Sequence, residues 1–446
     1  MSDDQNGTNP SNGLNPEDFE AFLRDFMSGQ SGLDPAQLAA AAGLPNDPEA
    51  LKQLIEQLRG ALGGMNSTSG ETGVNWELAT NQAKAIAKSE SLAILDSTRK
   101  AIADAVSIGA LWLNGATSIS ELTTEPKLLS REMWVADAVP LFQALAQPVA
   151  DRMSEALSEN MRLNAPEELN ELLGNASGLM KSAGGALFAM QLGQALGKLS
   201  AEVLSGGDIG LPIFKDQRAA FVPQNLSSFV DGLDVEKDQA FIYLAVREMA
   251  HARLFKHSKW LRDSIVSQIS NYAAGISIDN SRITELAEDF DPANTDELRR
   301  ALETGAFIAE RTEEQNLALA RIETLLALIE GWVDVVTEQA TKLLPKAAAI
   351  AEAVRRRRAT GGPAEQTFGT LIGLELRPRR LREAAAMWRT LDAALGSEKR
   401  DSLWNHPDLV PSSEDIDDPQ RLIDKLSGLV SDNDSLDQEL RDLLGE

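Results

Sequence analysis

The chain has 446 residues and a hydrophobic fraction of 43%, enough to bury one large core or two modest ones, so disorder throughout is excluded. Its 42 basic and 68 acidic residues give a formal charge of −26, which opposes binding of nucleic acid or anionic membranes by the whole surface. Cysteine is absent, which excludes disulfides, thiol nucleophiles and cysteine-ligated metal.

Residues 1–74 are predicted to form a flexible leader with short helices, because short helical patterns alternate there with breaks rich in Gly, Asn and Ser. Two segments of the leader, 16–27 and 47–62, place apolar residues at helical spacing. Such segments can dock on a partner or on the rest of the chain, and we favour the second.

Amphipathic helical patterns dominate residues 75–410, with few runs of strict alternation, so we expect a mainly α body. Residues 178–197 are rich in small residues and suit close helix packing, and the polar residues among them argue against a membrane segment. Residues 206–213 indicate a turn that leads into an extended piece, and 216–222 are a candidate strand. A small accessory sheet is therefore expected beside the helices.

The most informative motif is Arg247-Glu248-Met249-Ala250-His251 on a predicted helix. It has the spacing of the zinc-peptidase motif His-Glu-x-x-His, with arginine at the first histidine. In the intact motif two histidines on one helix face bind zinc, and the glutamate activates the metal-bound water. A guanidinium group has no lone pair to give, so Arg247 cannot be a ligand.

The other side chains of this helix have two interpretations each. His251 is the best metal-ligand candidate, or it is a core histidine bonded within the helices. Glu248 is the general base if metal is present, or a buried partner of an arginine such as Arg247 or Arg253. Tyr243 can donate to an oxyanion in a cleft, although packing is the default for a lone tyrosine on an apolar face.

A second motif, Glu330-Gly331-Trp332-Val333-Asp334, carries two carboxylates at i and i+4 on an apolar helical stretch. In thermolysin-like zinc peptidases a later helix supplies a glutamate as third ligand, and an aspartate one turn on orients the first histidine. Glu330 and Asp334 fit these two roles. Asp334 would then face Arg247 in a carboxylate–guanidinium pair.

Residues 355–358 are four consecutive arginines, a pattern that suggests nucleic acid when taken alone. No aromatic residues interleave the run, and the chain has many carboxylates, so we favour internal or protein-partner pairing. Residues 411–446 are predicted to be an acidic helical tail. His406 precedes a proline and either reaches across the cleft or packs with Trp404 to fasten the tail, and we favour packing.

With these motifs the chain resembles the bacterial zincin-like metallopeptidase family, whose members are often labelled zinc-dependent metalloproteases or hydrolases. The stretches that carry the resemblance begin near Trp76 and include 110–113, 130–135, 191–197, 210–212, 247–255, 330–334, 355–362 and 404–408. The resemblance implies a zincin-like, gluzincin-type fold and a peptidase-type cleft, with zinc as the expected cofactor. The arginine at position 247 departs from the family motif.

Two functions remain open. One is a pseudo-peptidase, in which Arg247 and Asp334 close the former metal site and the cleft binds a peptide or protein partner. The other is an active metal-dependent hydrolase, in which His251 and Glu330 bind the metal with a third group such as His257 or His406, and Glu248 activates the water. The number of available metal ligands favours the pseudo-peptidase, because two protein ligands hold zinc poorly. No apolar stretch approaches the ~20 residues of a membrane span and no signal peptide is visible, so a cytoplasmic protein is expected.

Overall fold

The structure is a computed structural model that describes residues 74–164, 170–277, 279, 309–360, 369 and 379–428. All of these residues belong to one compact unit of the chain. The predicted leader, except for Val74, lies outside the described residues, and so does the predicted tail beyond residue 428.

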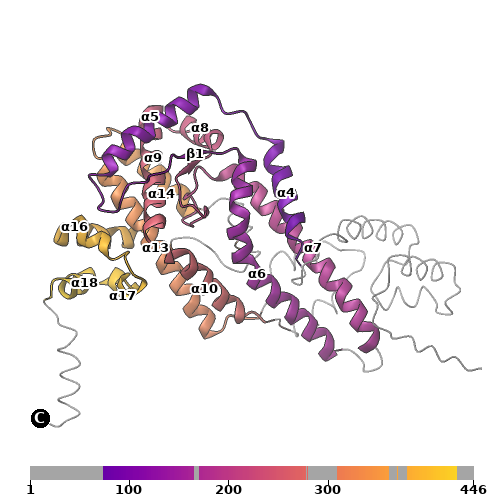
Figure 1. Ribbon diagram of the computed structural model, residues 1–446. Coiled ribbons are helices and arrows are strands. Elements are labelled where there is room, and N and C mark those ends of the chain that lie inside the picture. Colours follow the sequence, from indigo (N-terminus) through magenta and orange to yellow (C-terminus); the bar gives the residue numbers. More distant parts are fainter. Residues whose placement is uncertain are drawn as a thin grey trace, which may run out of the picture. The chain divides into compact units, whose positions relative to one another are not determined.

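The described residues are mostly helical, which confirms the expected mainly α fold (Figure 1). The labels follow Figure 1. The longer helices are α4 (Trp76–Ser89), α5 (Asp96–Leu113), α6 (Arg131–Asn164), α7 (Asn170–Glu202), α8 (Pro223–Asp231), α9 (Lys237–His257), α10 (Trp260–Ala274), α13 (Glu313–Ala340), α14 (Ala347–Thr360), α16 (Leu381–Ser402) and α18 (Pro419–Leu426). Among the described residues no helix is both long and apolar enough to span a membrane.

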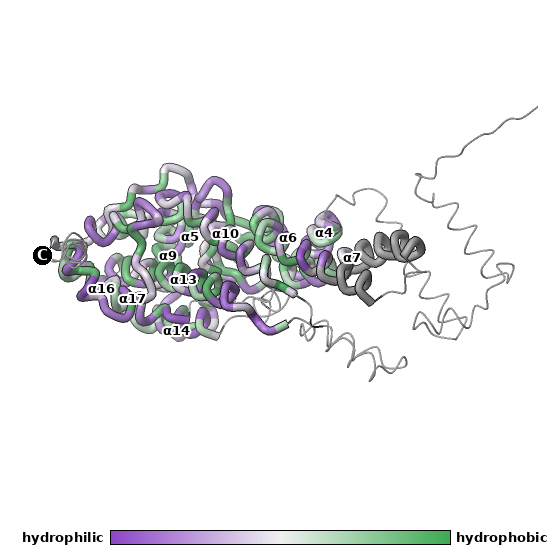
Figure 2. Tube along the Cα trace, turned by 90° about the horizontal axis from the view of Figure 1, so that it is seen from below, coloured by the Kyte–Doolittle hydropathy of each residue, from purple (hydrophilic) through white to green (hydrophobic). Residues whose placement is uncertain are grey.

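Two helices form the centre of the core. Every residue of α9 from position 243 to 255 is buried, and so is every residue of α13 from 326 to 337. A helix that is buried on all sides must lie inside the protein, and the charged side chains it carries need partners there. Figure 2 shows α9 and α13 between α5 and α14. This arrangement places both sequence motifs in the protein interior.

The other helices pack around this pair. Helix α5 contacts α9, α10 and α16 contact α13, and α14 contacts both central helices. Helices α4, α6 and α7 pack against one another, and α10 contacts α6. Helix α18 and the short α17 (Ser413–Asp417) pack on α16. The acidic segment after residue 411 thus contributes two helices that contact the body.

A small sheet lies beside the helices, as expected. Strand β1 (Lys127–Leu128) pairs in parallel with β2 (Ala220–Phe221), which falls within the stretch predicted as a strand. On the other edge of β2, Ser205 forms an isolated antiparallel bridge with Phe221. Strand β2 is therefore paired on both sides, and the chain on its second edge leads directly into the turn at residues 206–209.

Candidate functional site

The two central helices meet at a buried carboxylate. Arg247 and His251 lie one turn apart on α9 and share a face of that helix. Arg247 Nη2 donates a hydrogen bond to Glu330 Oε2 of α13, and His251 Nε2 lies 3.2 Å from Glu330 Oε1. Glu330 is fully buried, and Arg247 and His251 are 5% and 1% exposed. The structure thus brings together three of the residues that the two motifs singled out.

A second arginine reaches the same carboxylate. Arg358 of α14 is 3% exposed, and its Nη2 lies 3.5 Å from Glu330 Oε1. Burial alone would raise the pKa of Glu330, but the guanidinium groups of Arg358 and Arg247 hold it well below its ordinary value. Glu330 is therefore ionised and neutralised by two cations.

His251 is a hydrogen-bond donor in this cluster. Burial lowers the pKa of His251, although the charge of Glu330 opposes the shift, so the imidazole is neutral near pH 7. Both ring nitrogens face acceptors, since Nε2 lies beside the Glu330 carboxylate and Nδ1 beside the carbonyl oxygen of Arg247. A neutral imidazole carries one N–H, so His251 donates to one of these two acceptors.

Zinc, the metal that the motif spacing predicts, does not fit these donors. A zinc site needs three or four nitrogen, oxygen or sulfur ligands within about 2.3 Å of the ion. Within the described part of the chain, no group of three His, Cys, Asp or Glu side chains could hold a metal ion. His251 and Glu330 supply two donors at most, and the cation of Arg247 is bonded to one of them.

Glu248 faces a different direction from its neighbour Arg247. Its Oε2 accepts a hydrogen bond from Gly207 N at 2.8 Å and its Oε1 accepts one from Ala220 N at 2.9 Å. Burial raises the pKa of Glu248 to about 7, although hydrogen bonds from Ala220, Ser205 and Gly207 oppose the shift. The expected arginine partner is wrong, because Arg247 bonds Glu330, Arg253 bonds Asn114, and Glu248 accepts from backbone N–H groups.

Asp334 does not bond Arg247, which corrects the expected pair. Its carboxylate accepts from Arg355 Nε at 3.2 Å, on both oxygens, and from Arg389 Nη2 at 3.4 Å. Glu330, one turn earlier on α13, takes the Arg247 guanidinium instead. Tyr243 is buried on α9, and burial together with the charge of Asp334 raises its pKa. It is thus held neutral within the core.

The arginine run on α14 supplies cations to buried carboxylates. Arg355 pairs with Asp334, Arg358 with Glu330, and Arg357 makes two 2.8 Å hydrogen bonds to Asp208. Sequence reasoning did not single out Asp208. The signal for it was indirect: several arginines on one helix of a highly acidic chain require acidic partners inside the fold.

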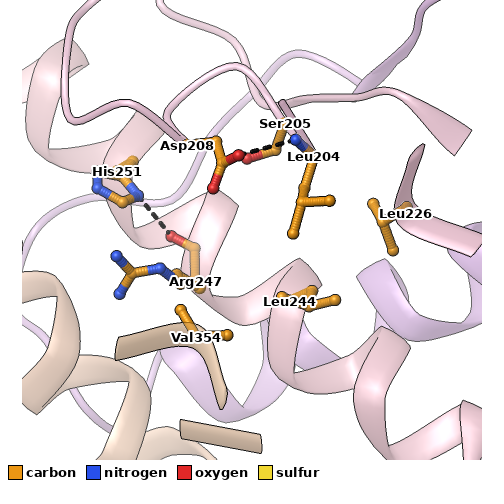
Figure 3. A pocket seen from close by; sticks show the side chains of 8 residues that line it. All are labelled: Leu204, Ser205, Asp208, Leu226, Leu244, Arg247, His251 and Val354. Carbon is orange, nitrogen blue, oxygen red and sulfur yellow. Dashed lines mark hydrogen bonds between the residues drawn. The ribbon is translucent and has the colours of Figure 1, made fainter. Parts of the chain in front are cut away.

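A small hollow opens beside this cluster (Figure 3). Asp208, His251 and Arg247 face it, and Leu204, Ser205, Leu226, Leu244 and Val354 complete its lining. Asp208 Oδ2 accepts a hydrogen bond from Leu204 N at 2.8 Å, and His251 Nδ1 lies 3.2 Å from the carbonyl oxygen of Arg247. Three charged or titratable groups and four aliphatic side chains thus share one hollow.

The remaining histidines do not join the cluster. His257 Nε2 lies 2.7 Å from Asn405 Oδ1. His406 is exposed, and its Nδ1 accepts a hydrogen bond from Asp408 N at 3.3 Å, which caps the 3-10 helix η2 (Pro407–Leu409). Trp404 is buried, and its ring lies 5.5 Å from that of Trp388. The contacts of His406 are therefore local, within its own turn.

Comparisons with known proteins agree with the fold. The sequence profile of the zincin-like metallopeptidases matches residues 74–423. A crystal structure described as that of a "putative hydrolase with a novel fold" from Chloroflexus aurantiacus superposes with a TM-score of 0.55. That alignment has 19% sequence identity and covers 79% of this chain and 99% of the other, so it concerns the fold alone. No curated protein matches the chain.

Proposed function

The chain belongs to the zincin-like metallopeptidase family, and from this premise we propose that it is a pseudo-peptidase. In this proposal the peptidase scaffold persists, Arg247 stands in place of the first zinc-binding histidine, and the site binds a peptide or protein partner without hydrolysing it. The observation that carries the proposal is the buried bond of Arg247 with Glu330, the side chain that would otherwise be a metal ligand.

The charges of the site support this proposal. A guanidinium group cannot coordinate a metal and repels a nearby cation. Arg247 and Arg358 supply the positive charge next to Glu330 that a zinc ion would supply. Removing both cations would leave a fully buried carboxylate without compensation, which is strongly unfavourable. The two arginines therefore neutralise the buried carboxylate of Glu330, as a zinc ion would, but they supply no metal chemistry.

A peptide or protein ligand fits the charge distribution better than nucleic acid does. The arginine run is the feature that suggests nucleic acid, and Arg355, Arg357 and Arg358 are engaged with carboxylates of the protein. The formal charge of −26 further opposes a polyanion.

One observation favours the alternative, an active metal-dependent hydrolase. The pKa of Glu248, raised to about 7 by burial, suits a general base at neutral pH. Both of its oxygens accept hydrogen bonds from backbone N–H groups, however, so the base would have to exchange these bonds for a water molecule. We therefore rank the hydrolase second.

Metal analysis by mass spectrometry on tag-free protein, purified without chelator, tests the proposal. We expect no stoichiometric zinc in the wild type and a gain of zinc in Arg247→His, which completes the ligand set with His251 and Glu330. Arg253→His is the matched control on the same helix, because Arg253 bonds Asn114 and not Glu330. Zinc in the wild type that is lost in His251→Ala and Glu330→Ala, with peptide hydrolysis that is lost in Glu248→Gln, would overturn the proposal.

A further inference from the structure

A segment of the chain itself lies in the site. Residues 204–211, here called the strap, follow α7 and run along the second edge of β2. Gly206 N donates to Ala220 O at 2.9 Å, and Val222 N donates to Leu204 O at 2.9 Å. The strap therefore pairs antiparallel with β2, on the edge opposite β1. Without it, that edge of β2 would present unpaired backbone groups that can receive another extended chain.

The strap touches the site residues mainly through its backbone. Gly207 N donates to Glu248 Oε2 at 2.8 Å. A Cβ atom at Gly207 would lie 2.6 Å from His251 Cβ, and one at Gly210 would lie 2.8 Å from Glu330 Oε1. Glycine is required at both positions by the close approach, and at Gly210 also by its φ of +73°. The strap thus occupies the space directly beside Glu248, His251 and Glu330.

Strap residues line two hollows. Leu204, Ser205 and Asp208 line the hollow shown in Figure 3, together with Arg247 and His251. Gly206, Gly207 and Leu211 line a second hollow, together with Glu248 and with Phe255. Both hollows border α9, and strap residues form a wall of each. Moving the strap out would therefore enlarge the space beside His251 and Glu248.

The strap is held by buried apolar side chains, since Leu204, Ile209 and Leu211 belong to the hydrophobic core, and by one ion pair. Asp208 is the sole charged residue of the strap, and it makes two 2.8 Å hydrogen bonds to Arg357. Burial raises the pKa of Asp208, but the charge of Arg357 outweighs burial and lowers it, so the carboxylate is ionised. The Arg357 side chain is 26% exposed, so solvent reaches this pair. The remaining bonds of the strap to β2 are backbone bonds that another extended peptide can replace one for one.

We propose that the strap is an internal occupant of the ligand groove, and that the ligand of the proposed function enters by displacing it. The ligand class is an extended peptide that pairs antiparallel with β2. It carries two small residues where Gly206 and Gly207 lie beside Glu248 and His251, followed by an acidic residue that bonds Arg357. The inference rests on the proposed function, because it names the partner of that same site.

The probe is a fluorescently labelled, end-capped peptide with the strap sequence Leu-Ser-Gly-Gly-Asp-Ile-Gly-Leu. Fluorescence anisotropy measures its binding to the full-length wild type, to Asp208→Ala and to Asp216→Ala. Asp216 is the control, because its side chain is half exposed and pairs with Arg218 in the loop after the strap. We expect Asp208→Ala to bind about 10-fold more tightly than the wild type, since Arg357 then lacks its carboxylate partner and can bond the peptide aspartate. Asp216→Ala should match the wild type.

A peptide with asparagine in place of its aspartate, and a scrambled peptide of the same composition, complete the test. Neither of these peptides should bind Asp208→Ala more tightly than it binds the wild type. Equal binding of all three proteins, or equal binding of the scrambled peptide, would overturn the proposal, because the site bound would then lie elsewhere.

Amide hydrogen exchange of the wild type provides a second measurement that does not depend on the folding of any variant. The strap amides of Gly206 and Gly207 should exchange by local opening, faster than the amides of α9. Exchange of the strap only through global unfolding would overturn the proposal. Neither measurement involves zinc or hydrolysis, so zinc-dependent activity would refute the pseudo-peptidase without changing either result for the strap.

Discussion

Arg247 of α9 donates a hydrogen bond to Glu330 of α13 in the interior of the protein, across 83 positions of sequence. The bond joins the two motifs that identify the family, and Arg358 and His251 contact the same carboxylate. A buried carboxylate with two cationic partners is costly to disturb, so the cluster governs both the stability of the core and the chemistry open to the site.

Substitution of Glu330 should destabilise the protein strongly. Glu330→Gln keeps the shape of the side chain but removes the buried negative charge that Arg247 and Arg358 contact, which we expect to cost about 3–5 kcal/mol in the free energy of unfolding. Urea denaturation measures this change. The control is Glu338→Gln on the same helix, which loses a partly exposed pair with Arg389 and should cost less than about 1 kcal/mol. Equal effects of the two substitutions would contradict the assigned role of the cluster.

Glu248 should make stability depend on pH in an unusual direction. Its pKa in the folded protein is about 7, above its ordinary value of 4.5, so folding favours the protonated form. The contribution is fully present below pH 4.5 and is lost as the pH rises through 7. A shift of this size corresponds to about 3 kcal/mol. Urea denaturation across this pH range measures it, and Glu248→Gln should flatten the profile. An unchanged profile in the variant would refute this assignment.

The close approach of the strap to α9 should make glycine necessary at position 207. Gly207→Ala places a Cβ atom 2.6 Å from His251 Cβ, and we expect a loss of about 1–3 kcal/mol from overpacking. Gly232→Ala is the control, because the nearest atom to its Cβ is Phe229 O at 3.4 Å. Thermal unfolding compares the two. A larger loss in Gly232→Ala would show that the strap does not press on the helix.

Two arginines of the run should contribute differently to the free energy of unfolding, although their side chains are identical. Arg358 is buried against Glu330, whereas Arg356 is exposed. Arg358→Ala should therefore lower the free energy of unfolding by more than about 2 kcal/mol, and Arg356→Ala should change it by less than about 0.5 kcal/mol. Chemical denaturation gives both values. Similar effects would mean that the run is a solvated surface and not a source of internal cations.

The helical class and the two site helices could be predicted because their signals are local. Long stretches of helix-forming residues without proline identify α9 and α13, and residues four apart share one face whatever the fold. The partners of Glu248 could not be predicted, since they are the backbone N–H groups of Gly207 and Ala220. Residue type does not reveal which backbone N–H group will bond a distant side chain.

The residues alone identify the family and the chemical character of position 247, because a guanidinium group has no lone pair in any fold. Only the tertiary structure decided which carboxylate receives which arginine. Glu330 and Asp334 are both on α13, yet Arg247 bonds the first and Arg355 the second. Pairing between distant segments depends on helix positions and side-chain reach, which helical spacing within one segment does not encode. For the same reason, only the packed structure placed the strap against His251.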